Sequence, residues 1–158
     1  MKKKLRKSEI RELNEELEKT YGLNEFFDKK ETVEKRKNII LKEDTPLFFY
    51  HEETIVPTLR QCQINCPLKK VTVDMGAVKF VTGGADIMRP GITAVDEFKK
   101  GEFVAVIDET NKKPLAIAKA LYSGEDIIRM KTGKVLENIH YVGDEIWTTG
   151  TGAQASRQ

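Results

Sequence analysis

Short apolar runs, each bounded by charged or turn-forming residues, account for most of the chain from residue 33 onward. They lie at residues 39–41, 47–50, 55–56, 103–107 and 115–120. Runs of this length between turn signals predict strands, and none approaches the roughly 20 apolar residues of a membrane-spanning helix. The pattern restricts the chain to small sheets and excludes a transmembrane protein.

One amphipathic helix precedes these strands. Ile10, Leu13, Leu17 and Tyr21 recur at helical spacing and share one face. Ser8 is a suitable N-cap, and Gly22 can end the helix in a left-handed conformation. We expect this helix to cover one face of a small sheet built from the runs between residues 33 and 57, with charged turns at residues 43–46 and 52–53.

The second half begins at a predicted strand, residues 71–73, which ends at Asp74. Asp74 can cap a brief helix that contains Ala77, Val78 and Val81, and the pair Gly83-Gly84 stops it. Pro90-Gly91 predicts a turn, and residues 109–113 predict a hairpin connection.

Farther along, Ser123 can cap a short helix that Gly133 would end. Gly143-Asp144 predicts a turn into a last strand at residues 146–147, in which Trp147 would be a core residue. We therefore predict an α+β chain with a domain at residues 1–68, another at 69–147, and a disordered tail at 148–158.

The amino-acid composition excludes few classes of function. Charged residues make up 33% of the 158 residues, but the net charge is only +2, so electrostatics neither requires nor excludes RNA. Five of the first seven residues are basic, and we predict a mobile, solvated terminus there that can touch phosphates: Lys2, Lys3, Lys4, Arg6 and Lys7. No apolar segment follows, so no secretory signal is expected, and two cysteines indicate a reducing cytoplasm rather than a disulfide framework.

The segment 74–91, DMGAVKFVTGGADIMRPG, strongly resembles the signature of PUA domains, which are small RNA-binding pseudo-barrels. Residues 123–128, 136–141, 143–144 and Trp147 resemble one subgroup, the malignant-T-cell-amplified-sequence or translation machinery-associated proteins. Residues 47–49 and 56–60 are similar to the domain that precedes PUA in that subgroup. The resemblance implies a small N-terminal α/β domain followed by a PUA β pseudo-barrel with short helices.

The same resemblance implies a function. It indicates an RNA-binding, cytoplasmic translation protein that docks on the small ribosomal subunit and tRNA during initiation, reinitiation or recycling. It also implies a partner that carries an initiation-factor-like SUI1 domain, and no enzymatic activity. The sequence leaves two alternatives open: an accessory RNA-binding module for tRNA or rRNA modification, and a protein-interaction adaptor without RNA binding.

The expected RNA contact lies mainly in the glycine-to-proline segment. It comprises Lys79, Gly83, Gly84, Ala85, Asp86, Met88, Arg89, Pro90, Gly91 and His140. Adjacent glycines allow close backbone approach, Met88 offers a polarizable surface, and Asp86 can accept an amino group or a 2′-hydroxyl. The residues alone favour a helix stop, a turn and a buried Met88 as the explanation of the segment, and the resemblance reverses that preference.

Two of these residues lead to specific expectations. Arg89 should lie in an exposed turn and bond to phosphate or base, so its replacement should hardly alter folding. His140 either contacts an unpaired nucleotide or satisfies a buried carbonyl, and Tyr141 beside it is expected in the core.

Cys62 and Cys66 could form a metal site with His51 and His140, although zinc ligands are usually paired more tightly, and we favour ordinary thiols. Neither a phosphate-binding loop nor a nucleophile elbow is present. The sequence therefore indicates a binding protein without a cofactor, a metal or a membrane partner.

Overall fold

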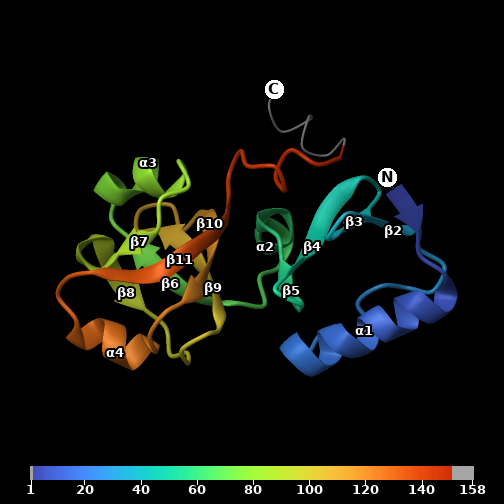
Figure 1. The fold of residues 1–158 in the computed structure, drawn as a ribbon, viewed down its shortest axis with the longest axis horizontal. Coiled ribbons are helices and arrows are strands. Elements are labelled where there is room, and N and C mark those ends of the chain that lie inside the picture. Colours follow the sequence, from blue (N-terminus) through green and yellow to red (C-terminus); the bar gives the residue numbers. More distant parts are fainter. Residues whose placement is uncertain (1, 151–158) are drawn as a thin grey trace.

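The computed structural model describes residues 2–150, which form two sheets with helix α2 between them (Figure 1). The first sheet is an antiparallel meander in the order β1-β2-β3-β4-β5. Its strands are β1 (Lys2–Lys4), β2 (Val33–Arg36), β3 (Ile39–Lys42), β4 (Thr45–His51) and β5 (Thr54–Pro57). The predicted strands around residues 39–41, 47–50 and 55–56 are confirmed. The mixture of helices and sheets also confirms the α+β fold class.

Charged residues form the tight turns of this sheet, as predicted. Glu43 and Asp44 connect β3 to β4, and Glu52 and Glu53 connect β4 to β5. All four have positive φ, between 47° and 69°. Two such residues in succession match the right-handed twist of the flanking strands, which explains why the connections are so short.

Helix α1 (Lys7–Tyr21) buries Ile10, Leu13 and Leu17 against the first sheet and ends at Gly22, whose φ is +72°. These features confirm the predicted helix, but its predicted N-cap is wrong. The N-cap is Arg6, two residues before Ser8, and the Glu9 carboxylate accepts the backbone N–H of Arg6 at 3.0 Å.

The N-terminal basic run is also more ordered than expected. Residues Lys2–Lys4 form β1 and pair with β2, where Lys2 lies opposite Arg36. The Nζ atom of Lys2 lies 2.6 Å from an Asp44 carboxylate oxygen, which anchors the strand to the β3–β4 turn. The prediction of a mobile terminus is therefore wrong for this segment.

The second sheet has the order β7-β11-β10-β9-β6-β8. Its strands are β6 (Lys69–Val73), β7 (Ile87–Met88), β8 (Ile92–Val95), β9 (Phe103–Asp108), β10 (Pro114–Ala120) and β11 (Lys134–Tyr141). Strands β6 and β9 pair in parallel, and the other neighbours are antiparallel. The sheet surrounds an apolar core that includes Val71, Val106 and Ile127.

Short helices connect the strands of this second sheet. They are the 3-10 turn η1 (Met75–Ala77), α3 (Val78–Val81), the 3-10 turn η2 (Arg89–Gly91) and α4 (Gly124–Arg129). Both predicted caps are confirmed. The Asp74 carboxylate accepts a hydrogen bond from the Ala77 N–H, and the Ser123 hydroxyl accepts one from the Asp126 N–H. Helix α4 ends at Arg129, before the Gly133 at which we expected it to end.

The chain after β11 differs from the prediction. No strand forms at residues 146–147, because the Asp144 carboxylate accepts the N–H groups of Tyr141 and Trp147 and folds this segment into turns. Thr148 continues the turns through a hydroxyl bond to the Asp144 carbonyl at 3.1 Å. Of the tail predicted at residues 148–158, residues 151–158 lie outside the described part of the chain.

Helix α2 (Leu59–Ile64) fills the space between the sheets (Figure 1). Phe49 from the first sheet, Leu59 from α2 and Ile117 from the second sheet belong to one buried apolar cluster. This shared core packs the two sheets against each other. Among residues 2–150, no helix is long and apolar enough to cross a membrane.

Candidate nucleic-acid interface

The segment from Asp74 to Gly91 contains η1, α3, the edge strand β7 and η2 (Figure 1). The backbone N–H of Asp74 donates to the carbonyl of Gly91 at 2.8 Å, which holds the two ends of the segment together. The Asp74 carboxylate also accepts the Ala77 N–H at 2.9 Å. The chain between these ends forms the wall of a cavity.

This cavity has a volume of about 480 Å³, a size typical of small-molecule sites. Its wall consists of Asp74, Gly76, Ala77, Phe80, Val81, Ala85, Asp86, Ile87, Met88, Pro90 and Gly91. Half of the expected RNA-contact residues are in this wall, namely Ala85, Asp86, Met88, Pro90 and Gly91. The others, Lys79, Gly83, Gly84, Arg89 and His140, are outside it.

Large apolar side chains are exposed at the cavity. Phe80 is 60% exposed and Met88 is 50% exposed. The Lys79 Nζ lies 5.1 Å from the centroid of the Phe80 ring. An exposed aromatic ring beside a cation suits the stacking of an unpaired base near its phosphate.

Phe80 was missing from the residues expected at this site. A signal for it was present, because Ala77, Val78 and Val81 occupy the core-facing side of the short helical segment. Phe80 therefore has no place in that core. A large aromatic residue outside the apolar stripe of a helix is a candidate for binding.

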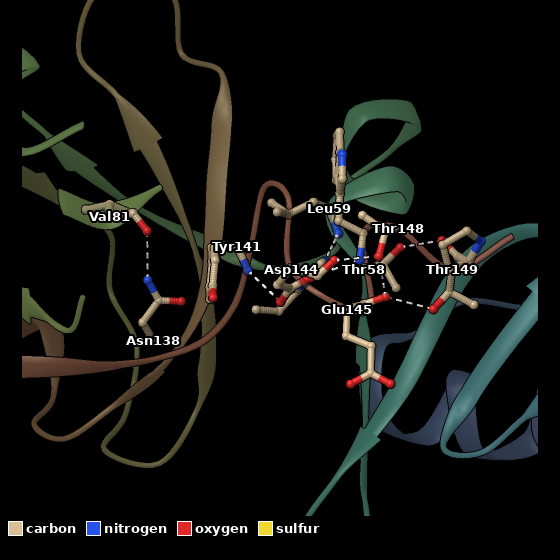
Figure 2. A network of polar contacts seen from close by, with 12 residues as sticks. Thr58, Leu59, Val81, Asn138, Tyr141, Asp144, Glu145, Thr148 and Thr149 are labelled. Atoms are coloured by element: carbon tan, nitrogen blue, oxygen red, sulfur yellow. Dashed lines mark hydrogen bonds and ion pairs between the residues drawn. The ribbon is translucent and has the colours of Figure 1, made fainter. Parts of the chain in front are cut away.

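Asp86 has both a structural contact and spare acceptor capacity. One of its carboxylate oxygens accepts the Asn138 N–H at 2.9 Å, and the other lies 3.4 Å from the Lys134 Nζ. The Asn138 amide donates to the carbonyls of Val81 and Ala85, both at 3.0 Å, and Figure 2 shows the first of these bonds. These contacts fix the turn after α3, while the carboxylate, with about four acceptor positions, can still bind an amino or hydroxyl group.

Gly84 serves the packing of the protein. Its φ is +95°, and a Cβ atom there would lie 2.9 Å from the Tyr141 ring. Tyr141 is half-buried against the core of the second sheet, as predicted. The space beside Gly84 is therefore occupied by Tyr141, and the expected close approach of ribose or phosphate has no room on that side.

The Arg89 side chain points at the protein's own backbone. Its Nε donates to the Ile127 carbonyl at 2.6 Å, and its Nη1 donates to the Ile92 carbonyl at 3.2 Å. The Nη2 atom lies 3.5 Å from the carbonyl oxygen of Ile128. The guanidinium thus binds carbonyl groups of the last turn of α4 and of the first residue of β8, and the Ile127 carbonyl also accepts the Met130 N–H at 3.1 Å. The expectation that Arg89 lies in an exposed turn is therefore wrong, because its side chain is half-buried and bonded to backbone carbonyls.

His140 is fully buried and cannot contact RNA in this structure, which corrects its expected role. Its Nε2 accepts the Leu59 N–H at 3.1 Å, and its Nδ1 lies 2.9 Å from an Asp144 carboxylate oxygen. Burial raises the pKa of Asp144, but the hydrogen bond from His140 and those from Trp147 and Tyr141 lower it below its ordinary value overall. His140 therefore satisfies a buried backbone N–H, rather than the buried carbonyl that the sequence suggested.

The C-terminal turns are held on α2 by a second contact. The Arg60 guanidinium lies 3.5 Å from the centroid of the Trp147 ring, a stacked cation–π geometry. Figure 2 shows Asp144 in the same region, between Tyr141 and the residues that begin α2. The chain that leaves the second sheet is thereby attached to the helix that follows the first sheet, which joins the two sheets a second time.

The two cysteines lie in the apolar cluster between the sheets, with Cys62 buried and Cys66 half-buried. A hydrogen bond between the thiols lowers the pKa of Cys66 to about 7 and raises the pKa of Cys62. In the described part of the chain, no group of three or more His, Cys, Asp or Glu residues is placed to hold a metal ion. His140 is engaged elsewhere, so the metal site considered from the sequence does not assemble.

Comparison with known proteins identifies the family to which this chain belongs. Residues 69–142 match the PUA domain family. An uncharacterized protein of Methanocaldococcus jannaschii is 38% identical over 150 residues, covering 90% of this chain and 93% of that protein. Malignant T-cell-amplified sequence 1 of Rattus norvegicus is 34% identical over 141 residues, covering 79% and 75%. The chain belongs to the malignant-T-cell-amplified-sequence family of PUA-domain proteins.

Membership in this family confirms the resemblance found in residues 74–91 and in the first half of the chain. Translation machinery-associated protein 20 of Schizosaccharomyces pombe is another relative, 36% identical over 110 residues, of whose length the chain covers 60%. A crystal structure of a hypothetical protein from Pyrococcus horikoshii matches with a TM-score of 0.77 and 34% identity, covering 93% of this chain and 98% of that one. The two-sheet arrangement is therefore shared over nearly the whole length.

Proposed function

We propose that this protein is an RNA-binding translation factor that receives a single-stranded RNA end in the cavity lined by Phe80 and Met88. The observation that carries the proposal is the pair of exposed apolar side chains beside Lys79, at a cavity of about 480 Å³. A base can stack on Phe80 and cover surface that is now in water, while Asp86 accepts a bond from an amino or hydroxyl group. The relatives named for the translation machinery support a role in translation.

In this proposal the RNA is a tRNA or the rRNA of the small ribosomal subunit, and the protein acts in initiation, reinitiation or recycling. The division expected at residue 68 then has a functional meaning: the PUA domain holds the RNA end, and the N-terminal domain contacts the ribosome or a SUI1-domain partner. The protein acts by binding and positioning.

Binding of a single-stranded RNA hexanucleotide with a free 3′ end tests this site. We expect Phe80→Ala to weaken binding by roughly 1–3 kcal/mol, the range measured for loss of base–aromatic stacking. Ile128→Ala is the matched control, because Ile128 is also 60% exposed but lies outside the cavity wall. Equal affinities of wild type, Phe80→Ala and Ile128→Ala for the hexanucleotide would contradict the proposed site.

A further inference from the structure

A second cavity of about 490 Å³ lies at the start of the chain, between the end of β1, the first turn of α1 and the loop before β2. We call it the N-terminal groove. Its charged side chains are Lys4, Arg6, Lys7, Lys29 and Lys30, opposed by the single carboxylate of Glu31. The Glu31 carboxylate is already paired with Lys42.

Most of these cations are not neutralised by the protein. Within residues 2–150, Lys4, Lys7, Lys29 and Lys30 form no ion pair, and all four are exposed. Their neighbours differ: Lys2 pairs with Asp44, and Lys3 pairs with Glu9. Of the five cations that line the groove, only Arg6 is paired, with Glu9, among the described residues.

This arrangement costs stability, because like charges repel and Lys7 lies in the first turn of α1, where the helix dipole disfavours cations. The cost is removed when an anion lies among the cations. The β1 pairing fixes the backbone of Lys4, and the Lys30 N–H is bound by Asp28 at 2.9 Å, so the groove is built on ordered backbone.

We infer that the N-terminal groove binds the phosphate backbone of a second RNA segment. The inference rests on the proposed function, in which RNA is the polyanion that this protein binds. It also depends on charge complementarity, because phosphates spaced along a strand suit several separate lysines. A membrane surface is disfavoured, since none of the large hydrophobic side chains exposed in residues 2–150 lies in this groove.

The two RNA contacts are far apart. Strand β1 and the first turn of α1 lie at one end of the long axis, and α3 and β7 lie toward the other end (Figure 1). The packed core around α2 connects them as one body. One RNA end in the cavity at Phe80 and one backbone segment in the N-terminal groove would therefore be held at a fixed separation, and the second contact would add avidity to the first.

The test uses a blunt 16-base-pair RNA duplex, which has no unpaired end for the cavity, together with the single-stranded hexanucleotide. The groove variant is Lys7→Gln/Lys29→Gln/Lys30→Gln. We expect it to bind the duplex roughly tenfold or more weakly, with the slope of log K against log salt reduced by about 2 to 3. Hexanucleotide binding should stay within about twofold of wild type in this variant. Phe80→Ala should give the reverse pattern.

The matched control removes three exposed lysines from the loops that precede and follow β9, Lys99→Gln/Lys100→Gln/Lys113→Gln, which also form no ion pair in the described residues. An equal loss of duplex binding in this control would overturn the inference, because the effect would then be general electrostatics. Wild-type affinity of the groove variant for the duplex would overturn it as well.

The remaining outcomes separate the two proposals. If wild type binds the hexanucleotide but not the duplex, the groove inference fails and the proposed function stands. If wild type binds the duplex through the groove lysines but not the hexanucleotide, the cavity proposal fails and the inference stands. Vesicles of phosphatidylserine and phosphatidylcholine provide the last comparison, and lysine-dependent binding to them without duplex binding would overturn the RNA assignment.

Discussion

Replacing Arg89 by Ala should destabilise the protein and leave RNA affinity nearly unchanged. The substitution removes two well-formed charge-assisted bonds, to the carbonyls of Ile127 at 2.6 Å and Ile92 at 3.2 Å. Hydrogen bonds to charged groups contribute about 1.5–3 kcal/mol each when buried. Because this side chain is only partly buried and water can replace it, we expect a total loss of about 2 kcal/mol. The melting temperature should then fall by about 4–8 °C for a chain of this size.

Urea unfolding followed by circular dichroism measures this loss, and the hexanucleotide affinity is measured in parallel. Arg129→Ala is the control, because Arg129 is at the same end of α4 but its only ion pair within residues 2–150 is an exposed one with Glu125 at 2.7 Å. Such surface pairs contribute about 0–1 kcal/mol. An Arg89→Ala protein that is as stable as Arg129→Ala and loses tenfold or more in RNA affinity would contradict a structural role of Arg89. That result would mean that the guanidinium leaves the carbonyls and binds RNA.

Three further changes test the packing and the charges. Gly84→Ala should destabilise by about 2 kcal/mol or more in urea unfolding, because φ is +95° and the new Cβ meets the Tyr141 ring; wild-type stability would contradict this. Glu53→Gly should raise the free energy of unfolding by about 0.5–1 kcal/mol, because glycine adopts the φ of 69° without strain, and a lower melting temperature would refute it. The lowered pKa of Asp144 stabilises the fold at pH values above its unfolded pKa, near 4, and this contribution disappears as the pH falls through the folded pKa. Urea unfolding at a series of pH values should show the stability gap between wild type and Asp144→Asn narrowing below pH 4, and a gap that widens there would refute the assignment.

The fold was largely predictable because its signals are local. The turns at residues 43–44 and 52–53, the Asp74 cap and the Gly22 C-cap each depend on residues a few positions apart. The predicted strand at residues 146–147 failed for the opposite reason. Its apolar residues fit a strand, but the Asp144 carboxylate bonds two nearby backbone N–H groups and folds the chain into turns.

The candidate site was predictable only as a segment. Residues 74–91 fold as one unit, and five of the residues named from them line the cavity, while the binding of RNA there stays a prediction. The sequence could not assign the roles of Arg89 and His140, because their partners are about 40 and 80 positions away: Ile127 for Arg89 and Leu59 for His140. The sequence of a basic or aromatic residue near a glycine turn is the same whether its side chain binds RNA or the protein's own backbone.

Co-sedimentation with purified small ribosomal subunits on a sucrose gradient measures whether the protein binds the translation machinery. At low salt, wild-type protein should migrate with intact subunits. The combined variant Phe80→Ala/Met88→Ala should shift substantially toward the top of the gradient, while the control Ile128→Ala should migrate like wild type. Wild-type protein that remains entirely at the top, with the subunits intact, would contradict the claim that this PUA-domain protein is an RNA-binding translation factor.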